Sequence, residues 1–227
     1  MEIHKLDIVH QDFHPHPGNI LSYDFDDPDF IMISDFELIL SKLIGANPNN
    51  PEKKNIFGVL PYIAPEVLSG DEEYTKAADV YSFGIIAYEI VTGFHPYPDI
   101  PYDNDLAMKI CNGLRPKIPF RTPKLITTIM RCWDARVTRR PTFEELREEL
   151  WKYYDDYYNY LEYKKNKDLE IGIQTPLNYQ THPQAIYTSR LLNFSKLPRP
   201  KNKENFEKEL KELTESFSHI ITKIQLN

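Results

Sequence analysis

The strongest constraint on the fold is a stretch between residues 79 and 92 that is apolar on almost every side. Its apolar members are Val80, Tyr81, Phe83, Ile85, Ile86, Ala87, Ile90 and Val91. A helix at a protein surface keeps one polar face, whereas a helix that is apolar all round belongs inside a core. Gly93 follows and provides the usual stop, because glycine adopts the left-handed backbone of a helix end. The sequence therefore predicts a central helix around which other helices pack.

Further elements agree with a mainly α domain. A short helix is predicted over residues 105–112, and Thr122-Pro123 has the pattern of a helix start. Thr142 and Glu145 form a capping box at the start of another helix. Two apolar runs, at 20–21 and 30–33, flank acidic residues and predict a small β-hairpin. The predicted fold class is mainly α with one small hairpin.

The last third of the chain differs in composition. Residues 154–203 begin tyrosine-rich and continue polar with scattered prolines, which predicts a tail or linker. Residues 204–225 carry apolar side chains at heptad spacing, from Phe206 to Ile224. Two interpretations of this amphipathic helix stay open: it docks on its own lobe, or it mediates self-association with a second copy.

Composition excludes several classes of protein. The 227 residues carry a net charge of −7 and no basic stripe, so we expect no nucleic-acid partner. No run approaches the roughly 18 apolar residues that span a membrane, and the first 12 residues lack a signal-peptide core, so we expect no membrane partner. Cys111 and Cys132 are too few for a disulfide framework and indicate reduced thiols in a cytoplasmic protein.

Four short motifs occur in a fixed order: Val-His-Gln-Asp at 9–12, Ser-Asp-Phe at 34–36, Pro-Tyr-Ile-Ala-Pro-Glu at 61–66 and Arg-Arg-Pro-Thr at 139–142. Together they resemble the landmarks of the C-terminal lobe of eukaryotic protein kinase catalytic domains, of tyrosine-kinase-like or serine/threonine type. The resemblance covers residues 1–153 and implies the C-terminal lobe of an α+β parent fold. No glycine-rich loop or strand lysine precedes the first motif, so we expect the N-terminal lobe to be absent. Residues 181–190 resemble tails in expanded kinase-like families of some soil fungi.

The resemblance implies roles for individual residues. Asp12 would be the catalytic residue that accepts the proton of the substrate hydroxyl, while Asn19 and Asp35 would hold Mg²⁺. The substrate-positioning loop would comprise Gly58, Pro61 and Tyr62. The implied function is ATP-dependent phosphorylation of protein Ser/Thr or Tyr hydroxyls, with ATP and Mg²⁺ as cofactors and a protein substrate as partner.

Three further residues would have structural roles in such a lobe. Glu66 and Arg140 are expected to form a buried ion pair that ties the activation segment to the last helices. Asp79, at the start of the central helix, is expected to accept backbone N–H groups of the catalytic loop. These residues argue for the fold and leave activity open.

Departures from the family pattern support two alternatives. Six residues separate Asp12 from Asn19 where the family has four, Gln11 replaces the usual arginine, and Glu37 replaces a glycine. A catalytically impaired pseudokinase that serves as an interaction module is therefore the main alternative. The histidines between residues 10 and 16, interleaved with Asp12, leave a metal-dependent hydrolase as a remote one.

Overall fold

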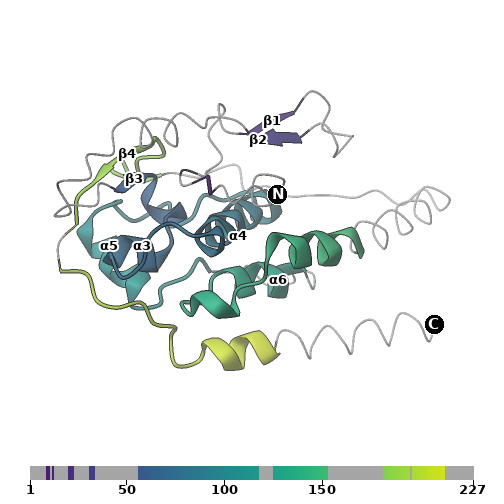
Figure 1. The fold of residues 1–227 in the computed structure, drawn as a ribbon. Helices are drawn as coiled ribbons and strands as arrows, with labels where there is room; N and C mark the ends of the chain where they lie inside the picture. Colours follow the sequence, from purple (N-terminus) through teal and green to yellow (C-terminus); the bar gives the residue numbers. More distant parts are fainter. Residues whose placement is uncertain are drawn as a thin grey trace, which may run out of the picture.

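The computed structural model describes residues 9–10, 12, 20–22, 31–33, 56–117, 125–152, 181–194 and 196–212. In this part of the chain, helices gather around α4, with a two-stranded sheet at one side and a second, separate strand pair above (Figure 1). No helix in the described ranges has the length and apolar character needed to cross a bilayer.

Helix α4 (Lys76–Thr92) is the predicted central helix. It begins three residues earlier than expected because Thr75 caps it, accepting a hydrogen bond from the Ala78 N–H at 3.3 Å. It ends at Gly93, whose φ of 72° is the left-handed conformation that glycine favours. Tyr81 and its neighbours are fully enclosed, but Ile90 in the last turn is 77% exposed. The prediction of an all-round apolar contact surface is therefore wrong at Ile90, whereas its neighbour Val91 packs against the core.

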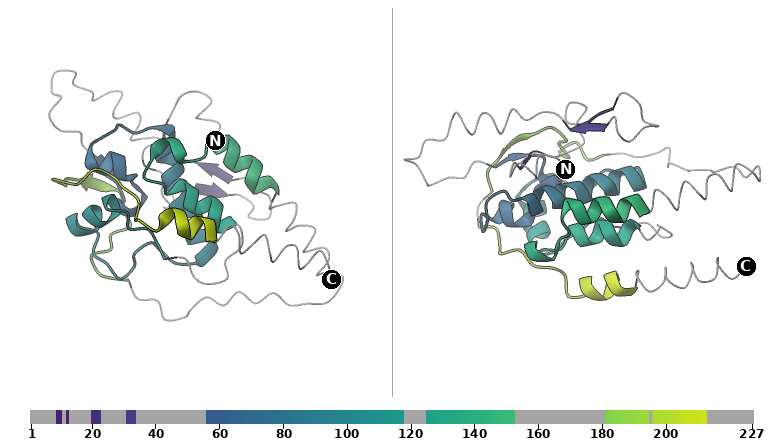
Figure 2. Two further views of the ribbon diagram at one scale, coloured as in Figure 1. Left: turned by 90° about the horizontal axis from the view of Figure 1, so that it is seen from below. Right: turned by 45° about the vertical axis from the view of Figure 1, so that its right-hand side comes forward.

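Helix α6 (Leu125–Cys132) lies against α4. A Cβ at Gly84 would lie 2.6 Å from the Cβ of Cys132 and 2.8 Å from Nε1 of Trp133. A side chain at Gly84 would thus force the two helices apart. A further helical segment, residues 143–152, lies beside them (Figure 2), and the ring of Phe143 meets that of Phe83 edge-on at 5.5 Å.

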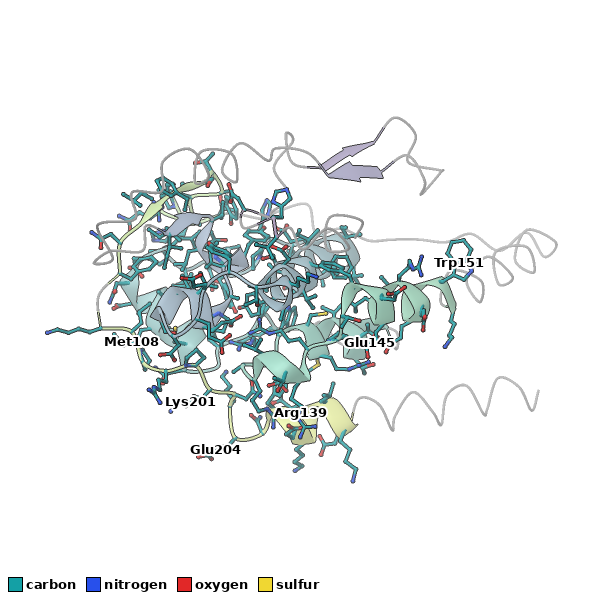
Figure 3. The ribbon with its side chains drawn as sticks, viewed as in Figure 1. Met108, Arg139, Glu145, Trp151, Lys201 and Glu204 are labelled. Atoms are coloured by element: carbon teal, nitrogen blue, oxygen red, sulfur yellow. The ribbon has the colours of Figure 1, made fainter. Side chains whose placement is uncertain are left out.

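The predicted capping box at the start of this segment is confirmed. The Thr142 N–H donates to Oε2 of Glu145 at 2.7 Å, and the Glu145 N–H donates to Oγ1 of Thr142 at 3.2 Å. The segment runs away from the body of the molecule, and Figure 3 shows Trp151 near its far end, where the side chain is 59% exposed.

Two short helices and a 3₁₀ turn complete the lobe. Helix α3 (Pro65–Ser69) packs on α5 (Asn104–Cys111), and the buried turn η2 (Leu60–Tyr62) precedes α3. Helix α5 begins one residue earlier than predicted because Asp103 accepts hydrogen bonds from the Asp105 and Leu106 N–H groups. The sequence thus located α5 to within one residue, whereas it did not predict α3.

The structure contains two strand pairs. Strands β1 (Ile20–Ser22) and β2 (Ile31–Ile33) pair antiparallel, with Ile20 opposite Ile33, so the predicted hairpin is confirmed. Strands β3 (Ile56–Gly58) and β4 (Arg190–Leu192) also pair antiparallel, with Gly58 opposite Arg190. The sequence did not predict this second pair, because β4 lies inside the segment interpreted as a linker.

The C-terminal part of the chain wraps the lobe. Residues 181–194 and 196–212 pass β3 and α5 and end in a helical stretch, 206–212, below α6 (Figure 2). The Lys201 N–H donates to the Cys111 carbonyl at 3.0 Å, and Phe206 is only 5% exposed within the core. Over its described residues the expected linker therefore lies on the lobe, and the start of the heptad helix docks in the same way. Residues 213–225 of the heptad prediction lie outside the described residues.

Candidate active site

The end of strand β3 lies directly against Asp12. Asp12 is 7% exposed, and a Cβ at Gly58 would lie 3.2 Å from its Oδ1 and 2.5 Å from Cδ1 of Ile63. Gly58 also has a φ of +143°, which side chains rarely tolerate. Glycine is therefore required here both by the backbone and by the nearness of the carboxylate.

The segment that carries Asp12 is attached to the central helix. The His10 N–H donates to Oδ2 of Asp79 at 2.7 Å, and both residues are 1% exposed. Asp79 lies in the first turn of α4, where the helix dipole stabilises a negative charge. This contact agrees with the expected role of Asp79 and fixes the backbone two residues before Asp12.

Tyr74 is a member of this cluster that the sequence did not single out. Its hydroxyl donates to the Phe57 carbonyl at 3.2 Å, one residue before Gly58. Burial raises the pKa of Tyr74, and the negative charges of Asp12 and Asp79 raise it further. The phenol therefore stays protonated and supplies a neutral donor beside two carboxylates. No sequence signal marked it, because a lone tyrosine before a helix is common.

Glu66 and Arg140 form the buried pair that the sequence predicts. The Arg140 guanidinium donates from Nη1 and Nη2 to the two carboxylate oxygens of Glu66, each at 2.7 Å, and the side chains are 0% and 3% exposed. Arg140 also donates to the carbonyls of Asp134 and Ala77 at 2.8 and 2.9 Å, and it lies over the ring of Tyr81. The arginine thus joins α3, α4 and the turn that precedes residues 143–152.

Helix α4 contacts the expected substrate-positioning loop through a hydrogen bond. Pro61 and Tyr62 belong to η2 and are buried, Tyr62 being 3% exposed. The Ser82 hydroxyl of α4 donates to the Tyr62 carbonyl at 2.7 Å. The side chain of Tyr62 therefore faces the core, which makes it a packing residue, whereas Gly58 lies beside the carboxylate.

The expected metal ligands Asn19 and Asp35 lie outside the described residues, as do Gln11, Glu37 and the histidines at 14 and 16. Of the expected site residues, the structure therefore brings together Asp12, Gly58 and Asp79, with Tyr74 added.

Residues 2–150 match the family model for the protein tyrosine and serine/threonine kinase domain. The chain belongs to this family. Because the match spans the four motifs and all the helices described above through residue 150, the family's catalytic domain accounts for the lobe.

Individual proteins of two organisms are also similar to this chain in sequence. A probable serine/threonine-protein kinase of Dictyostelium discoideum is 32% identical over 149 residues, covering 65% of this chain and 11% of that protein. The dual specificity protein kinase shkE of the same organism is 37% identical over 122 residues, covering 53% and 17%. Vascular endothelial growth factor receptor 2 of Coturnix japonica is 34% identical over 126 residues, covering 55% and 9%. The chain thus spans less than a fifth of the length of each of these relatives.

Proposed function

We propose that this protein transfers the γ-phosphoryl group of ATP to hydroxyl groups of a protein substrate, with Asp12 as the catalytic residue. The observation that carries the proposal is the position of Asp12, buried at the end of β3 and held through His10 by Asp79. A carboxylate placed in this way can orient a substrate hydroxyl and accept its proton as the oxygen attacks phosphorus.

The nucleotide and its metal are proposed on the donor chemistry. Asn19 directly precedes β1, and Asp35 follows β2 by two residues, while Ile20 and Ile33 pair across the hairpin. The chain therefore enters and leaves the hairpin at one end. Amide and carboxylate oxygens are the hard ligands that Mg²⁺ prefers, so Asn19 and Asp35 fit the ion. When bound, Mg²⁺–ATP supplies the phosphoryl group and neutralises the charge that develops on it.

We also propose which hydroxyl groups accept the phosphoryl group and where in the cell the protein acts. The relatives include proteins named as serine/threonine and as dual specificity kinases, so we propose that Ser/Thr and Tyr hydroxyls are all candidates. Cys111 and Cys132 are both fully buried free thiols, which suits a reducing compartment, and a cytoplasmic location is proposed.

The test measures the rate of phosphoryl transfer from labelled ATP to a mixed peptide library. The enzyme in this assay is the full natural protein that contains these residues. Asp12→Asn is expected to lower kcat by about 10²–10⁴-fold, because it removes a general base. Asp71→Asn is the matched control, since it makes the same substitution at an exposed aspartate that is not a member of the Asp12 cluster. A wild-type rate no higher than that of Asp12→Asn would contradict catalysis by Asp12.

A second candidate function is an interaction module without catalysis. One observation favours it: residues 190–192 of the chain itself pair with β3 beside Asp12. For residues 1–227 alone we expect only weak binding of ATP–Mg²⁺, because the glycine-rich loop and lysine of the family are missing from this sequence. Calorimetric titration checks this: micromolar affinity would contradict the expectation.

A further inference from the structure

We propose that three basic residues of the C-terminal part of the chain, Arg199, Lys201 and Lys203, form a docking site for a short acidic segment of a partner protein. We call these three residues the basic strip. They lie between β4 and the helical stretch 206–212. Figure 1 shows this part of the chain passing along the lower edge of the lobe, whereas β1 and β2 lie at the upper edge. The inference does not depend on the proposed phosphotransfer function.

Side chains alternate between the solvent and the lobe along the strip. The three basic residues are exposed, and the residues that alternate with them are partly buried: Pro198, Pro200 and Asn202. Such a period of two is that of an extended chain, in which alternate side chains lie on one side, roughly 7 Å apart. Every outward position from 199 to 203 therefore carries a positive charge, at the spacing that alternate side chains have in a second extended chain.

The main chain of the strip is fixed on the lobe. The Lys201 N–H donates to the Cys111 carbonyl at 3.0 Å, and the side chain of Asn202 forms hydrogen bonds to the lobe on both its oxygen and its nitrogen. A Cβ at Gly113 would lie 2.6 Å from the backbone nitrogen of Lys203. The strip can thus lie this close only because residue 113 is a glycine. Its charges form a fixed row, so an incoming segment does not have to order them.

The positive charges of the strip are available to a partner. The Arg199 side chain is 92% exposed, and its nitrogen lies 3.9 Å from the nearest carboxylate oxygen, that of Asp71, so this ion pair contributes little. Within the described part of the chain, neither Lys201 nor Lys203 takes part in an ion pair. The like charges repel one another, and a row of carboxylates on a partner would relieve that repulsion.

Carboxylates at both ends limit the length of the partner. Asp71 lies beside Arg199 at one end, and Glu204 directly follows Lys203 at the other. Figure 3 shows Lys201 and Glu204 at the same lower edge of the molecule. A nucleic acid or an anionic membrane presents an extended negative surface, which these carboxylates and the net charge of −7 repel. A segment with acidic residues at a few alternate positions meets the strip alone, so a short acidic protein segment is the occupant that fits.

Fluorescence anisotropy of two synthetic peptides tests the inference with the full chain. In the first peptide three glutamates alternate with serines, and in the second the same three glutamates are consecutive. The alternating peptide is expected to bind, and its dissociation constant is expected to rise with salt, because exposed charges are screened. The second peptide is expected to bind about threefold more weakly, since consecutive side chains of an extended chain point to opposite sides.

Charge reversal of the strip is the main variant. Lys201→Glu combined with Lys203→Glu is expected to weaken binding of the alternating peptide by about tenfold or more. Lys208→Glu combined with Lys211→Glu is the matched control, since it makes the same change of net charge at exposed positions of the helical stretch that follows. The control is expected to weaken binding by less than about twofold, through screened long-range repulsion alone.

Gly113→Ala tests the arrangement of the strip without changing its charge. The added Cβ has to displace the main chain at Lys203, so this variant is expected to bind the alternating peptide about threefold more weakly. Hydrogen exchange of the amides in Lys76–Thr92 checks that each variant keeps its core, and exchange of the Lys201 amide reports whether the strip stays docked. In the charge-reversal variant both should stay protected, because the changed side chains are exposed.

Each outcome decides one way. Loss of binding confined to the reversed strip, with preference for the alternating peptide, supports the inference. Equal loss in the two double variants, or equal binding of the two peptides, overturns it, because net charge then accounts for the result. No binding by the wild type at millimolar peptide also overturns it. Tighter binding of a single-stranded oligonucleotide or of a phosphatidylserine vesicle at the same salt does so too, since the partner would belong to another class.

Two outcomes concern the variants themselves. If charge reversal releases the strip, Lys201→Gln combined with Lys203→Gln takes its place and is judged by the same result. If Gly113→Ala exposes the Lys201 amide yet binds the peptide as the wild type does, the fixed row is wrong and the inference is overturned. If Gly113→Ala loses the core protection, the double variants decide.

Discussion

The lobe and the tail that wraps it are held by different kinds of contact. The lobe buries the carboxylate of Glu66 and the guanidinium of Arg140, whose side chains are 3% and 0% exposed. It also buries aromatic residues such as Tyr81 and Trp133, which water does not reach. The described part of the tail, residues 181–194 and 196–212, contributes three buried apolar side chains, and partly buried apolar residues and hydrogen bonds of main chain and side chains add to its attachment. The difference indicates that the lobe unfolds as one unit, whereas the tail can detach while the lobe stays folded.

A polar junction joins the two regions. Asn202 of the tail accepts the Ala135 N–H at 2.7 Å and donates to Oδ1 of Asp134 at 2.8 Å. Burial raises the pKa of Asp134, but hydrogen bonds from Arg136 and Asn202 outweigh it and lower that pKa overall. Arg136 also contacts Glu207 of the tail. Arg136 and Glu207 are exposed, so their ion pair contributes little to the attachment, whereas the Asn202 hydrogen bond is made to the buried Asp134.

The largest effect is expected from Arg140→Ala. It strands the Glu66 carboxylate inside the lobe and should lower the free energy of unfolding by about 3–5 kcal/mol. Urea denaturation measures this loss. Arg147→Ala is the control, because its ion pair with Glu144 is 64% exposed on the arginine side and should contribute less than about 1 kcal/mol. Equal losses for the two variants would contradict the account of the lobe.

Phe206→Ala should affect the tail alone. Truncating a buried phenylalanine costs roughly 3 kcal/mol or more, but here the cost is limited to the free energy of docking residues 196–212. The Lys201 amide, bonded to the Cys111 carbonyl, should then exchange much faster, while amides of α4 stay protected. Ile186→Ala, at a 37% exposed tail position, serves as the control. A matching loss of protection in α4 would show that tail and lobe unfold together.

The buried thiols make the stability of the lobe depend on pH. Burial raises the pKa of Cys132 from 9.0 to about 12 and that of Cys111 to about 11. Between pH 9 and 11 the folded chain therefore binds more protons than the unfolded chain, and the free energy of unfolding falls as pH rises. Each thiol contributes up to about 1.4 kcal/mol per pH unit. Urea titrations at pH 8.5, 9.5 and 10.5 should show a shallower decline for Cys132→Ala; an unchanged slope would contradict burial of this thiol.

The comparison also separates what a sequence can and cannot predict. Helix α4 was predictable because its apolar residues fill one continuous stretch, and the Glu66–Arg140 pair because both residues lie in recognisable motifs. Strand β4 was not, since three residues in a polar tail have no periodicity and their partner lies more than 130 positions away. Main-chain pairing leaves little trace in side-chain patterns.

Position Ile90 shows the same limit inside the lobe. An apolar residue in a continuous apolar stretch predicts burial, yet the side chain of Ile90 is 77% exposed, while the adjacent Val91 packs against the core. Tyr74 illustrates the reverse case, in which an unremarkable residue enters the site. For both residues the tertiary packing determines where the side chain lies, and the local sequence does not predict it.

The smallest effect is expected at the capping box of residues 143–152, near the outer edge of the lobe. The Thr142 N–H donates to the Glu145 carboxylate and lowers its pKa, so the ionised form stabilises the helix start. Glu145→Ala should cost about 1 kcal/mol at pH 7, and the difference from wild type should shrink as pH falls below 4.5, the ordinary pKa of the unfolded chain, and through the lowered pKa of the folded chain. Glu148→Ala, an exposed change in the same segment, controls for helix propensity. A difference from wild type that does not shrink at low pH would contradict this role of the Glu145 carboxylate.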